Sequence, residues 1–496
     1  METNIAGQKV EIARITPYVV FTCILAGSGG LMYGYDLVVA GGISIMDDFL
    51  LKFYPNVYAH KKSSKDDNYC KYNDQVFQLF SSSLYLAALL ATFLASVISK
   101  KFGRRTTMLF AGMFFICGTV LGTAAQNLAM LIAGRAFLGC GLGFANQAIP
   151  VYLSEIAPPS MRGGMNILFV VYTTVGILSG NIVNYLAAKL HPWGWRLSLG
   201  MAGIPAVLLT IFSLIIVESP SSLIERGRDE EAKEVLQRIR GTSEVSGEFG
   251  ELVGSCRKAQ EIGNGGWKPF RKLFCERKHR GEMVVACSMP FFQQVAGNDA
   301  IMFYGTFLFK LAGFGDQAAL YSAIIIGVCS FLSCSASSLF VDKLGRRPLL
   351  LFGSSLMASA LVIVGSIFAA KLTGDVRKLP STYSVTEVVM VCVFVVGFGI
   401  SVGPLAWLIP SEILSQEVRS AGQSVTVFVN MFFKSIIAQT FLSMLCGFKF
   451  GIFFFFAGWS IVMAIFTLLL LPETKHVPLS RMDIVWQNHW FWKRIM

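Results

Sequence analysis

KKFGRR at residues 100–105 and DKLGRR at residues 342–347 are two copies of one motif. The first copy follows the second long apolar run of the chain, and the other follows the second such run of the latter half. A motif that recurs at the same place in two halves indicates an internal duplication. The sequence therefore predicts two similar bundles of helices.

A second motif repeats in the same order. Glu155 lies in Ser-Glu-Ile at 154–156, and Arg162 follows seven residues later. Glu412 lies in the same tripeptide at 411–413, again with an arginine, Arg419, seven residues on. Two six-helix bundles related by an axis along the membrane normal are the simplest arrangement that gives this order.

Composition indicates a membrane protein. Of 496 residues, 54% are hydrophobic and 15% are charged, whereas soluble proteins have about 25% charged residues. A membrane-spanning helix needs about 20 apolar residues. Twelve runs of that kind lie at 18–37, 77–98, 107–126, 129–150, 164–187, 199–217, 283–309, 318–340, 348–370, 386–409, 420–445 and 450–471. The expected fold is all-α, with twelve transmembrane helices in two pseudo-symmetric six-helix bundles.

The charges indicate how the chain is divided and oriented. Four regions are expected, namely a first bundle at 1–217, a helical segment at 218–281, a second bundle at 282–471 and a tail at 472–496. The net charge of +12 comes from Lys and Arg in short loops and in the central segment, which is the positive-inside pattern and not a nucleic-acid-binding surface. We therefore expect both termini and the central segment to be cytoplasmic.

Two cysteines fall on the opposite face. Cys70 lies in a polar loop over about 43–73, and Cys446 lies in a short turn near the end of the eleventh run. Disulfides survive outside the cell, so these two cysteines could form a bridge. Such a bridge would join the two halves of the chain. Two free thiols are the alternative that topology leaves open.

The duplicated charges suggest a moving device rather than an enzyme. No phosphate-binding loop, set of metal ligands or nucleophile constellation is present, so neither a cofactor nor a metal is expected. Acidic and basic side chains at helix ends are able to pair across two bundles in one conformation and to separate in another, although for each residue alone the arginines and lysines could serve only to set topology. The candidate gating residues are Arg104, Arg105, Glu155, Arg162, Asp342, Arg346, Arg347, Glu412 and Arg419.

Further motifs resemble a known family. Besides the Gly-Arg-Arg loops, they are Pro220-Ser221-Ser222-Leu223, Phe292-Gln293-Gln294 and Pro472-Glu473-Thr474-Lys475. With these the chain resembles the sugar porters of the major facilitator superfamily. Gly34-Tyr35-Asp36, Trp195-Arg196-Leu197-Ser198-Leu199-Gly200 and Arg419-Ser420-Ala421-Gly422-Gln423-Ser424 are similar to the plant monosaccharide/proton symporters in that family.

This resemblance implies alternating access with proton coupling. It makes Asp36 the proton acceptor and Arg135 its partner, and it implies a disulfide between Cys70 and Cys446. A carboxylate at membrane depth costs ~2.5–3.5 kcal/mol, and Asp36 lowers that cost either ionised beside Arg135 or protonated and unpaired. A static ion pair is the alternative. The expected sugar-binding residues are Gln293, Gln294, Trp407 and Asn430.

Four further candidate substrate-binding residues are among the positions that depart from the family pattern. Val170 and Ser330 stand where amides are common, and Asp299 carries a carboxylate in place of an amide that contacts sugar. Lys434 stands where an uncharged polar residue is expected. Lys434 and Asp299 either compensate each other or bracket a charged substrate, unless Lys434 merely extends to the membrane interface.

The resulting expectation is a monomeric, multi-pass plasma-membrane protein that couples uptake of a monosaccharide, a hexose such as glucose, to protons. Its partners would be the solute, protons and the lipid bilayer, with the proton gradient as the energy source. The first alternative is a porter of the same fold whose pocket takes a polyol, a sugar acid or a small specialised metabolite. A sugar sensor without transport is the second.

Overall fold

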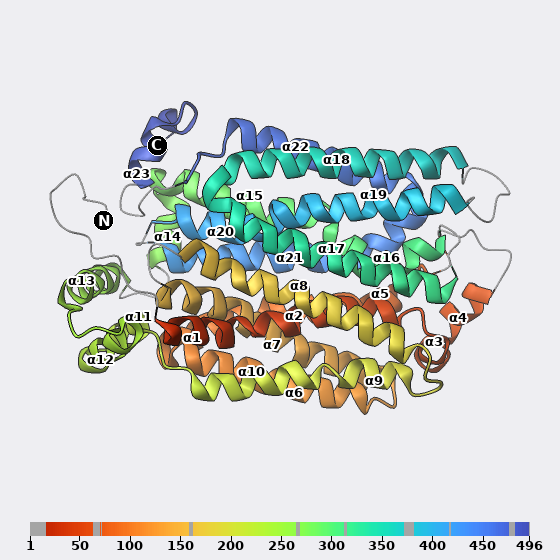
Figure 1. Cartoon of the computed structure of the whole chain (residues 1–496), viewed down its shortest axis with the longest axis horizontal. Helices are drawn as coiled ribbons and strands as arrows, with labels where there is room; N and C mark the ends of the chain where they lie inside the picture. Colours follow the sequence, from red (N-terminus) through yellow and green to blue (C-terminus); the bar gives the residue numbers. More distant parts are fainter. Residues whose placement is uncertain are drawn as a thin grey trace.

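Long helices running in nearly the same direction make up most of the chain (Figure 1). The computed structural model describes residues 16–62, 70, 72–157, 162–263, 268–311, 315–371, 381–415, 418–475 and 482–495. Eleven helical segments among these residues are long and apolar enough to cross a membrane. A broken pair of helices supplies the twelfth crossing, so the expected all-α fold of twelve spans is confirmed.

The first half supplies six crossings, and the first and sixth of these each consist of two consecutive helices. Along the chain they are α1 (Pro17–Gly27) with α2 (Gly29–Ile43), α5 (Gln75–Phe102), α6 (Arg104–Thr123), α7 (Leu128–Ile156), α8 (Arg162–Ala187), and α9 (Gly194–Gly200) with α10 (Gly203–Ile215). Polar side chains start the long helices: the Asp74 carboxylate accepts from the Phe77 amide at the first turn of α5 (2.9 Å), which satisfies a backbone donor that the helix itself leaves unpaired.

The second half repeats this order. Its crossings are α15 (Arg280–Val295) with α16 (Asn298–Leu311), α17 (Asp316–Leu344), α18 (Arg346–Lys371), α19 (Ser381–Ile400) with α20 (Val402–Ile413), α21 (Arg419–Phe448) and α22 (Gly451–Leu469). In Figure 1 the helices of the first half lie below those of the second.

The seventh crossing is not the continuous helix that the apolar run at 283–309 predicts. It breaks between α15 and α16 at Gly297, whose φ is 87°, a conformation that costs little only for glycine. A Cβ there would also lie 2.7 Å from the ring of Phe456. Hydropathy averaged over a whole run does not register such a break, because most residues of the run at 283–309 are apolar.

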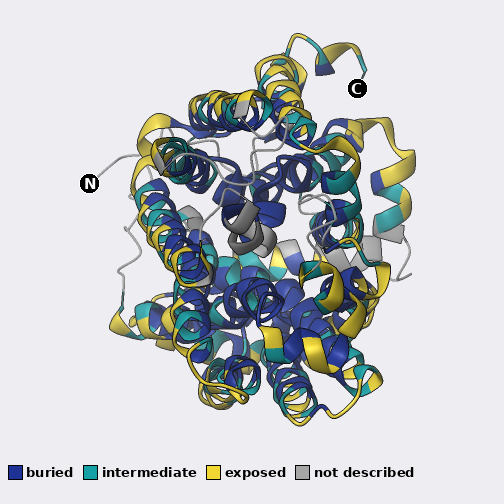
Figure 2. Cartoon of the chain, turned by 90° about the vertical axis from the view of Figure 1, so that its right-hand side faces the viewer, coloured by how far each residue is buried: buried dark blue, intermediate teal, exposed yellow. Residues whose placement is uncertain are grey.

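Exposed apolar side chains cover the outside of the bundle. Leu90, Val97 and Leu339 are more than 60% exposed, and Figure 2 shows exposed faces along the perimeter with buried residues inside. A solvent-exposed apolar band of this kind fits a lipid environment. The protein is a multi-pass membrane protein.

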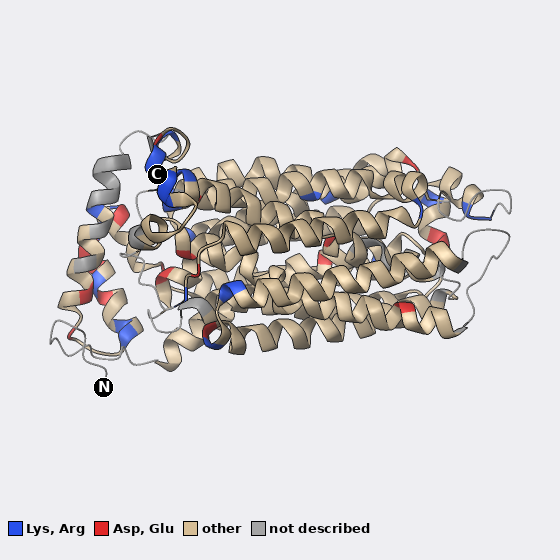
Figure 3. Cartoon of the chain, turned by 90° about the horizontal axis from the view of Figure 1, so that it is seen from above, with Lys and Arg blue, Asp and Glu red and all other residues tan. Residues whose placement is uncertain are grey.

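Short helices and most of the charged residues gather at one end of the bundle (Figure 3). These helices are α11 (Pro220–Glu225), α12 (Asp229–Arg240), α13 (Ser246–Gly263), α14 (Lys268–Cys275) and, in the tail, α23 (Met482–Asn488). Leu223, Ile224, Ala232 and Cys256 form a small core of their own. We call this the basic-loop end, because residues 103–105 and 345–347 lie there.

The opposite end carries α3 (Asp47–Phe53) and α4 (Pro55–Lys62). The sequence predicts only a polar loop over 43–73. Helix α3 is held in place by Phe49 and Phe53, which pack on Trp195 with ring centroids 6.0 and 5.3 Å away. We call this the disulfide end, because Cys70 and Cys446 are bonded there.

Candidate functional site

A buried ion pair joins two helices of the first half. The carboxylate of Asp36 on α2 lies 2.5 Å from the guanidinium of Arg135 on α7, and these side chains are 9% and 1% exposed. Arg135 also donates to the carbonyl of Phe80 (3.2 Å) and lies over the Phe80 ring. The structure thus brings together the two residues expected to couple protons, in the paired arrangement.

A second buried ion pair lies in the second half. The ammonium of Lys434 on α21 is 2.6 Å from the carboxylate of Asp299 on α16, and the Lys434 side chain is 1% exposed. Lys434 also donates to the hydroxyl of Tyr33 on α2. Of the alternatives for Lys434, the structure shows compensation by Asp299 and excludes extension to the interface.

An amide cluster lies next to this pair. Asn430 donates to the side-chain oxygen of Gln293 (2.7 Å), and Gln293 donates to the carbonyl of Gly403 (3.0 Å). Buried side-chain oxygens of Gln294, Asn298 and Asn430 have no hydrogen-bond partner in the described part of the chain. Buried oxygens without partners are costly, so the cluster is complementary to a ligand that donates hydrogen bonds.

For the remaining predicted binding residues, the structure shows burial or packing but no hydrogen bond to the amide cluster among the described residues. Trp407 is buried on α20, four residues after the Gly403 carbonyl that Gln293 contacts. Val170 on α8 packs against the core, and Ser330 is buried on α17. Neither of the last two side chains joins the amide cluster through a hydrogen bond among the described residues.

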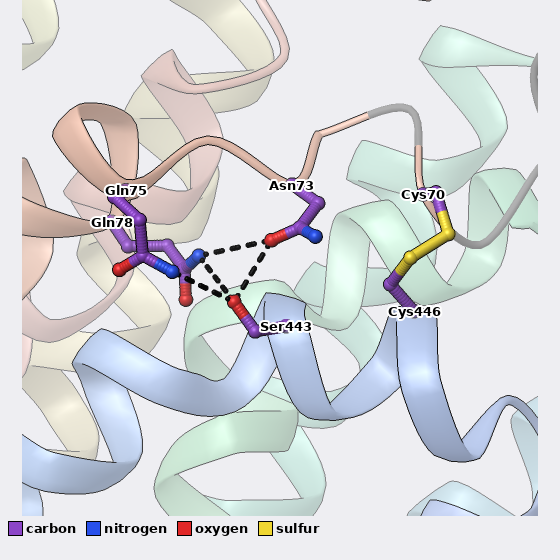
Figure 4. Close-up of a disulfide and its surroundings, with 6 residues drawn as sticks. All are labelled: Cys70, Asn73, Gln75, Gln78, Ser443 and Cys446. Carbon is purple, nitrogen blue, oxygen red and sulfur yellow. Dashed lines mark hydrogen bonds between the residues drawn. A yellow bond between two sulfur atoms is a disulfide. The ribbon is translucent and has the colours of Figure 1, made fainter.

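Polar links between the halves follow α5 and α21 toward the disulfide end. Ser82 hydrogen-bonds to Gln439. Farther out, Gln75 and Gln78 donate to the hydroxyl of Ser443, each over 3.1 Å. Figure 4 shows Gln75, Gln78 and Ser443 with the Cys70–Cys446 disulfide. We call this line of contacts the α5–α21 seam, and it joins the two halves toward the disulfide end.

The duplicated loops at the basic-loop end share one architecture. Gly103 and Gly345 end α5 and α17 with φ of 98° and 94°. Each is followed by an arginine that pairs with the glutamate of the Ser-Glu-Ile motif: Arg104 with Glu155 at 2.9 Å, and Arg346 with Glu412 at 2.7 Å. Asp342 adds a contact to Arg346 at 3.0 Å. The sequence repeat is therefore a repeat of contacts.

Among the described residues, the second arginine of each loop, a candidate gating residue, forms no ion pair with an acidic side chain. Arg105 donates to the carbonyls of Ser213 and Leu214 at the end of α10, and Arg347 donates to that of Leu468 at the end of α22. Both residues therefore satisfy carbonyls that a helix end leaves unpaired.

Sequence reasoning missed two acceptors of the loops. Glu218 accepts from the backbone amide of Arg104 (2.9 Å), and Glu473 accepts from that of Arg346 (3.0 Å). Both glutamates follow the last crossing of their half and precede a hydroxyl residue, Ser219 or Thr474. That shared dipeptide was the available signal.

The expectation that these charges pair across the bundles is not met in this conformation, because the ion pairs of the described loop residues lie within one half. Two uncharged hydrogen bonds join the halves near this end: Asn166 donates to Ser411 (3.3 Å) and Gln147 to Ser424 (3.4 Å). Arg419 donates to the carbonyl of Ser411 in its own half. The side chain of Arg162 lies outside the described residues.

Comparison with known proteins identifies the family. Residues 22–486 match the family described as "Sugar (and other) transporter". The chain belongs to this sugar transporter family. It is 53% identical to sugar transport protein MST4 of Oryza sativa subsp. japonica over 99% of this chain and 95% of that protein. It is also 53% identical to sugar transport protein 13 of Arabidopsis thaliana, over 100% and 94%.

Solved structures agree on the fold of this sugar transporter family member. The proton:xylose symporter XylE of the major facilitator superfamily, bound to 6-bromo-6-deoxy-D-glucose, matches with a TM-score of 0.80 at 23% identity, covering 95% of this chain and all of that one. The resemblance to sugar porters and to plant sugar transport proteins is confirmed. Membership of a transporter family also sets the chain apart from enzymes.

Proposed function

We propose that this sugar transporter family member carries a monosaccharide, such as a hexose, into the cell together with a proton. The buried Asp36–Arg135 pair is the observation that carries the proposal, since a lone carboxylate at this depth would be costly. The relatives named sugar transport proteins support a sugar as the solute. The printed description of XylE as a proton:xylose symporter supports the coupling ion.

Asp36 would act as a switch. Ionised, it holds Arg135 and ties α2 to α7. Protonated, it no longer balances the guanidinium, and the two helices are free to move relative to each other. A proton moving down about 100 mV releases about 2.3 kcal/mol, enough to concentrate a neutral solute on the order of fifty-fold.

The rest of the proposal concerns arrangement. Residues 1–217 and 282–471 would move as two bodies about the solute, with Gln293, Gln294, Trp407 and Asn430 contacting it. Arg104, Glu155, Arg346 and Glu412 would brace the helix ends that move. We place the disulfide end outside and the basic-loop end with both termini in the cytoplasm, in the plasma membrane. The unit of transport is one chain. It needs no cofactor, and the proton gradient is its energy source.

Radiolabelled uptake in cells lacking their own hexose carriers tests this proposal. The panel contains hexoses and polyols at acid and neutral external pH, with and without an uncoupler. We expect hexose uptake that increases at acid pH and collapses with the uncoupler. Hexose uptake unaffected by either condition would refute the coupling, polyol uptake without hexose uptake would replace the solute, and surface expression with binding but no uptake would favour a sensor.

A further inference from the structure

The Lys434–Asp299 pair carries an inference about the charge of the solute. Lys434 has three N–H donors. Asp299 accepts one at 2.6 Å and Tyr33 accepts another. The ammonium also faces the rings of Tyr33 and Tyr85, 4.6 and 5.0 Å from their centroids. The lysine of the second half is thus held by its own aspartate and by two tyrosines of the first half.

The pair borders the amide cluster at the break in the seventh crossing. Asn430 lies one turn before Lys434 on α21, and Asn298 precedes Asp299 at the start of α16. The Asp299 side chain is 13% exposed while that of Lys434 is 1% exposed. The exposed part of this pair therefore belongs to Asp299, whose charge is already balanced by Lys434.

We propose that Lys434 and Asp299 are specificity-determining residues that restrict the transport site to solutes without net charge, an inference that rests on the proposed function for the location of the site. Each of the two buried ion pairs joins one acidic and one basic side chain. The charges that α2, α7, α16 and α21 contribute through these pairs therefore sum to zero. Acceptor oxygens of Asp299, Gln294, Asn298 and Asn430 are suited to the hydroxyl donors of a neutral sugar.

A charged solute would disturb this balance. A sugar acid would need the ammonium of Lys434 for its carboxylate, which would leave Asp299 buried and unpaired. An amino sugar would draw on Asp299 and leave Lys434 unpaired. Breaking a buried pair by removing one partner is strongly unfavourable, so we expect neutral sugars to bind on the order of a hundred-fold more tightly than charged analogues of the same size.

A variant that lacks one charge of the Lys434–Asp299 pair should therefore bind a solute that carries the missing charge. In Asp299→Asn, Lys434 keeps Tyr33 but lacks its counter-ion, and we expect glucuronate to bind at least about ten-fold better than to the unmodified protein. In Lys434→Thr, Asp299 lacks its counter-ion, and we expect glucosamine to bind more tightly than to the unmodified protein by a similar factor. The double variant Asp299→Asn with Lys434→Thr is again balanced and should prefer glucose.

The experiment measures binding of glucose, glucuronate and glucosamine to the purified full chain and these three variants. Lys61→Thr is a matched control, because it breaks an ion pair with Asp47 at the disulfide end (2.5 Å) and should leave selectivity unchanged. Variants that fold poorly are recognised by their elution profile. For these, the ability of the charged sugar to raise the thermal unfolding temperature replaces the binding measurement.

The two proposals fail in different ways. Equal binding of glucose and glucuronate to the unmodified protein, or single variants that gain no charged ligand, would overturn the charge inference even if glucose is transported. If the unmodified protein does not bind glucose, the same assay is repeated with a neutral polyol in place of glucose. Selective binding of that polyol, with the same gains in the variants, would support the charge inference and refute only a monosaccharide as the solute.

Discussion

At the scale of single residues, buried charges explain what this chain must do to stay folded in a membrane. Asp36, Arg135, Asp299 and Lys434 are each at most 9% exposed as residues, and each has an opposite charge within 2.6 Å. A buried pair tolerates replacement of both partners far better than loss of one. Changes at these sites should therefore be judged in pairs.

Asp36→Asn tests the proton switch at this scale. The amide keeps the shape of the side chain and an acceptor oxygen for Arg135, but it has no charge and no proton to exchange. We expect the variant to equilibrate sugar across the membrane without concentrating it, measured as the ratio of internal to external labelled sugar with and without an uncoupler. Asp48→Asn, which changes an exposed partner of His191, is the control. Accumulation by the Asp36 variant at the unmodified level would contradict the proposed role.

At the scale of helices and loops, the duplicated motif is a brace for helix ends. Its glycine turns the chain with positive φ, its first arginine pairs with a glutamate, and its second arginine satisfies the carbonyls of the sixth or twelfth crossing. A Cβ on Gly103 would lie 2.1 Å from a carboxylate oxygen of Glu218, and one on Gly345 would lie 3.0 Å from Glu473. Each glutamate carboxylate therefore lies where a side chain on the turn glycine would be.

Gly103→Ala should destabilise the protein by roughly 2–4 kcal/mol, because it adds a steric clash to an unfavourable φ. Gly227→Ala is the matched control, since Gly227 has φ of 75° but open space at the Cβ position, and it should cost only about 1–2 kcal/mol. Thermal unfolding of the purified variants in detergent measures the difference. Equal losses in the two variants would show that the contact with Glu218 contributes nothing.

The short helices at the basic-loop end also make a chemical prediction. Burial raises the pKa of the Cys256 thiol to about 12, whereas Cys275 on α14 is exposed. Because the thiolate is the reactive form, Cys256 should be alkylated far more slowly than Cys275 near neutral pH, and its rate should keep rising as the pH increases toward 12. Mass spectrometry of peptides after timed alkylation checks this. Similar rates for both cysteines in the folded protein would mean that the small core around Cys256 opens.

At the scale of the whole molecule, the two halves are joined unequally. The α5–α21 seam combines a disulfide with hydrogen bonds at Ser82, Ser443 and Gln439. Near the basic-loop end, the hydrogen bonds between halves in the described residues are longer and uncharged. A cycle of alternating access from this conformation would have to part the seam at its hydrogen bonds, while the disulfide keeps Cys70, before α5, joined to Cys446 near the end of α21.

Replacing both Cys70 and Cys446 by serine should lower the free energy of unfolding by about 2–5 kcal/mol, because the bridge closes a long loop of the unfolded chain. The bridge spans 376 residues of sequence. Thermal unfolding with and without reductant measures the effect, and Cys117→Ser, at an exposed free cysteine, is the control. Reductant should lower the unfolding temperature of the unmodified protein and not that of the double variant, and an unfolding temperature unchanged in both would contradict a stabilising bridge.

The sequence by itself determined the number of crossings, their order and the duplication, because apolar runs and short motifs are local properties of a chain. It also identified Asp299 and Lys434 as charges out of place. Tertiary packing alone decided that these two meet, that Tyr33 of the other half holds the lysine, that Arg105 and Arg347 bind helix ends, and that the seventh crossing breaks at Gly297. Contacts between residues far apart in the chain depend on how helices lie against one another, and the hydropathy of each helix carries no record of its partner.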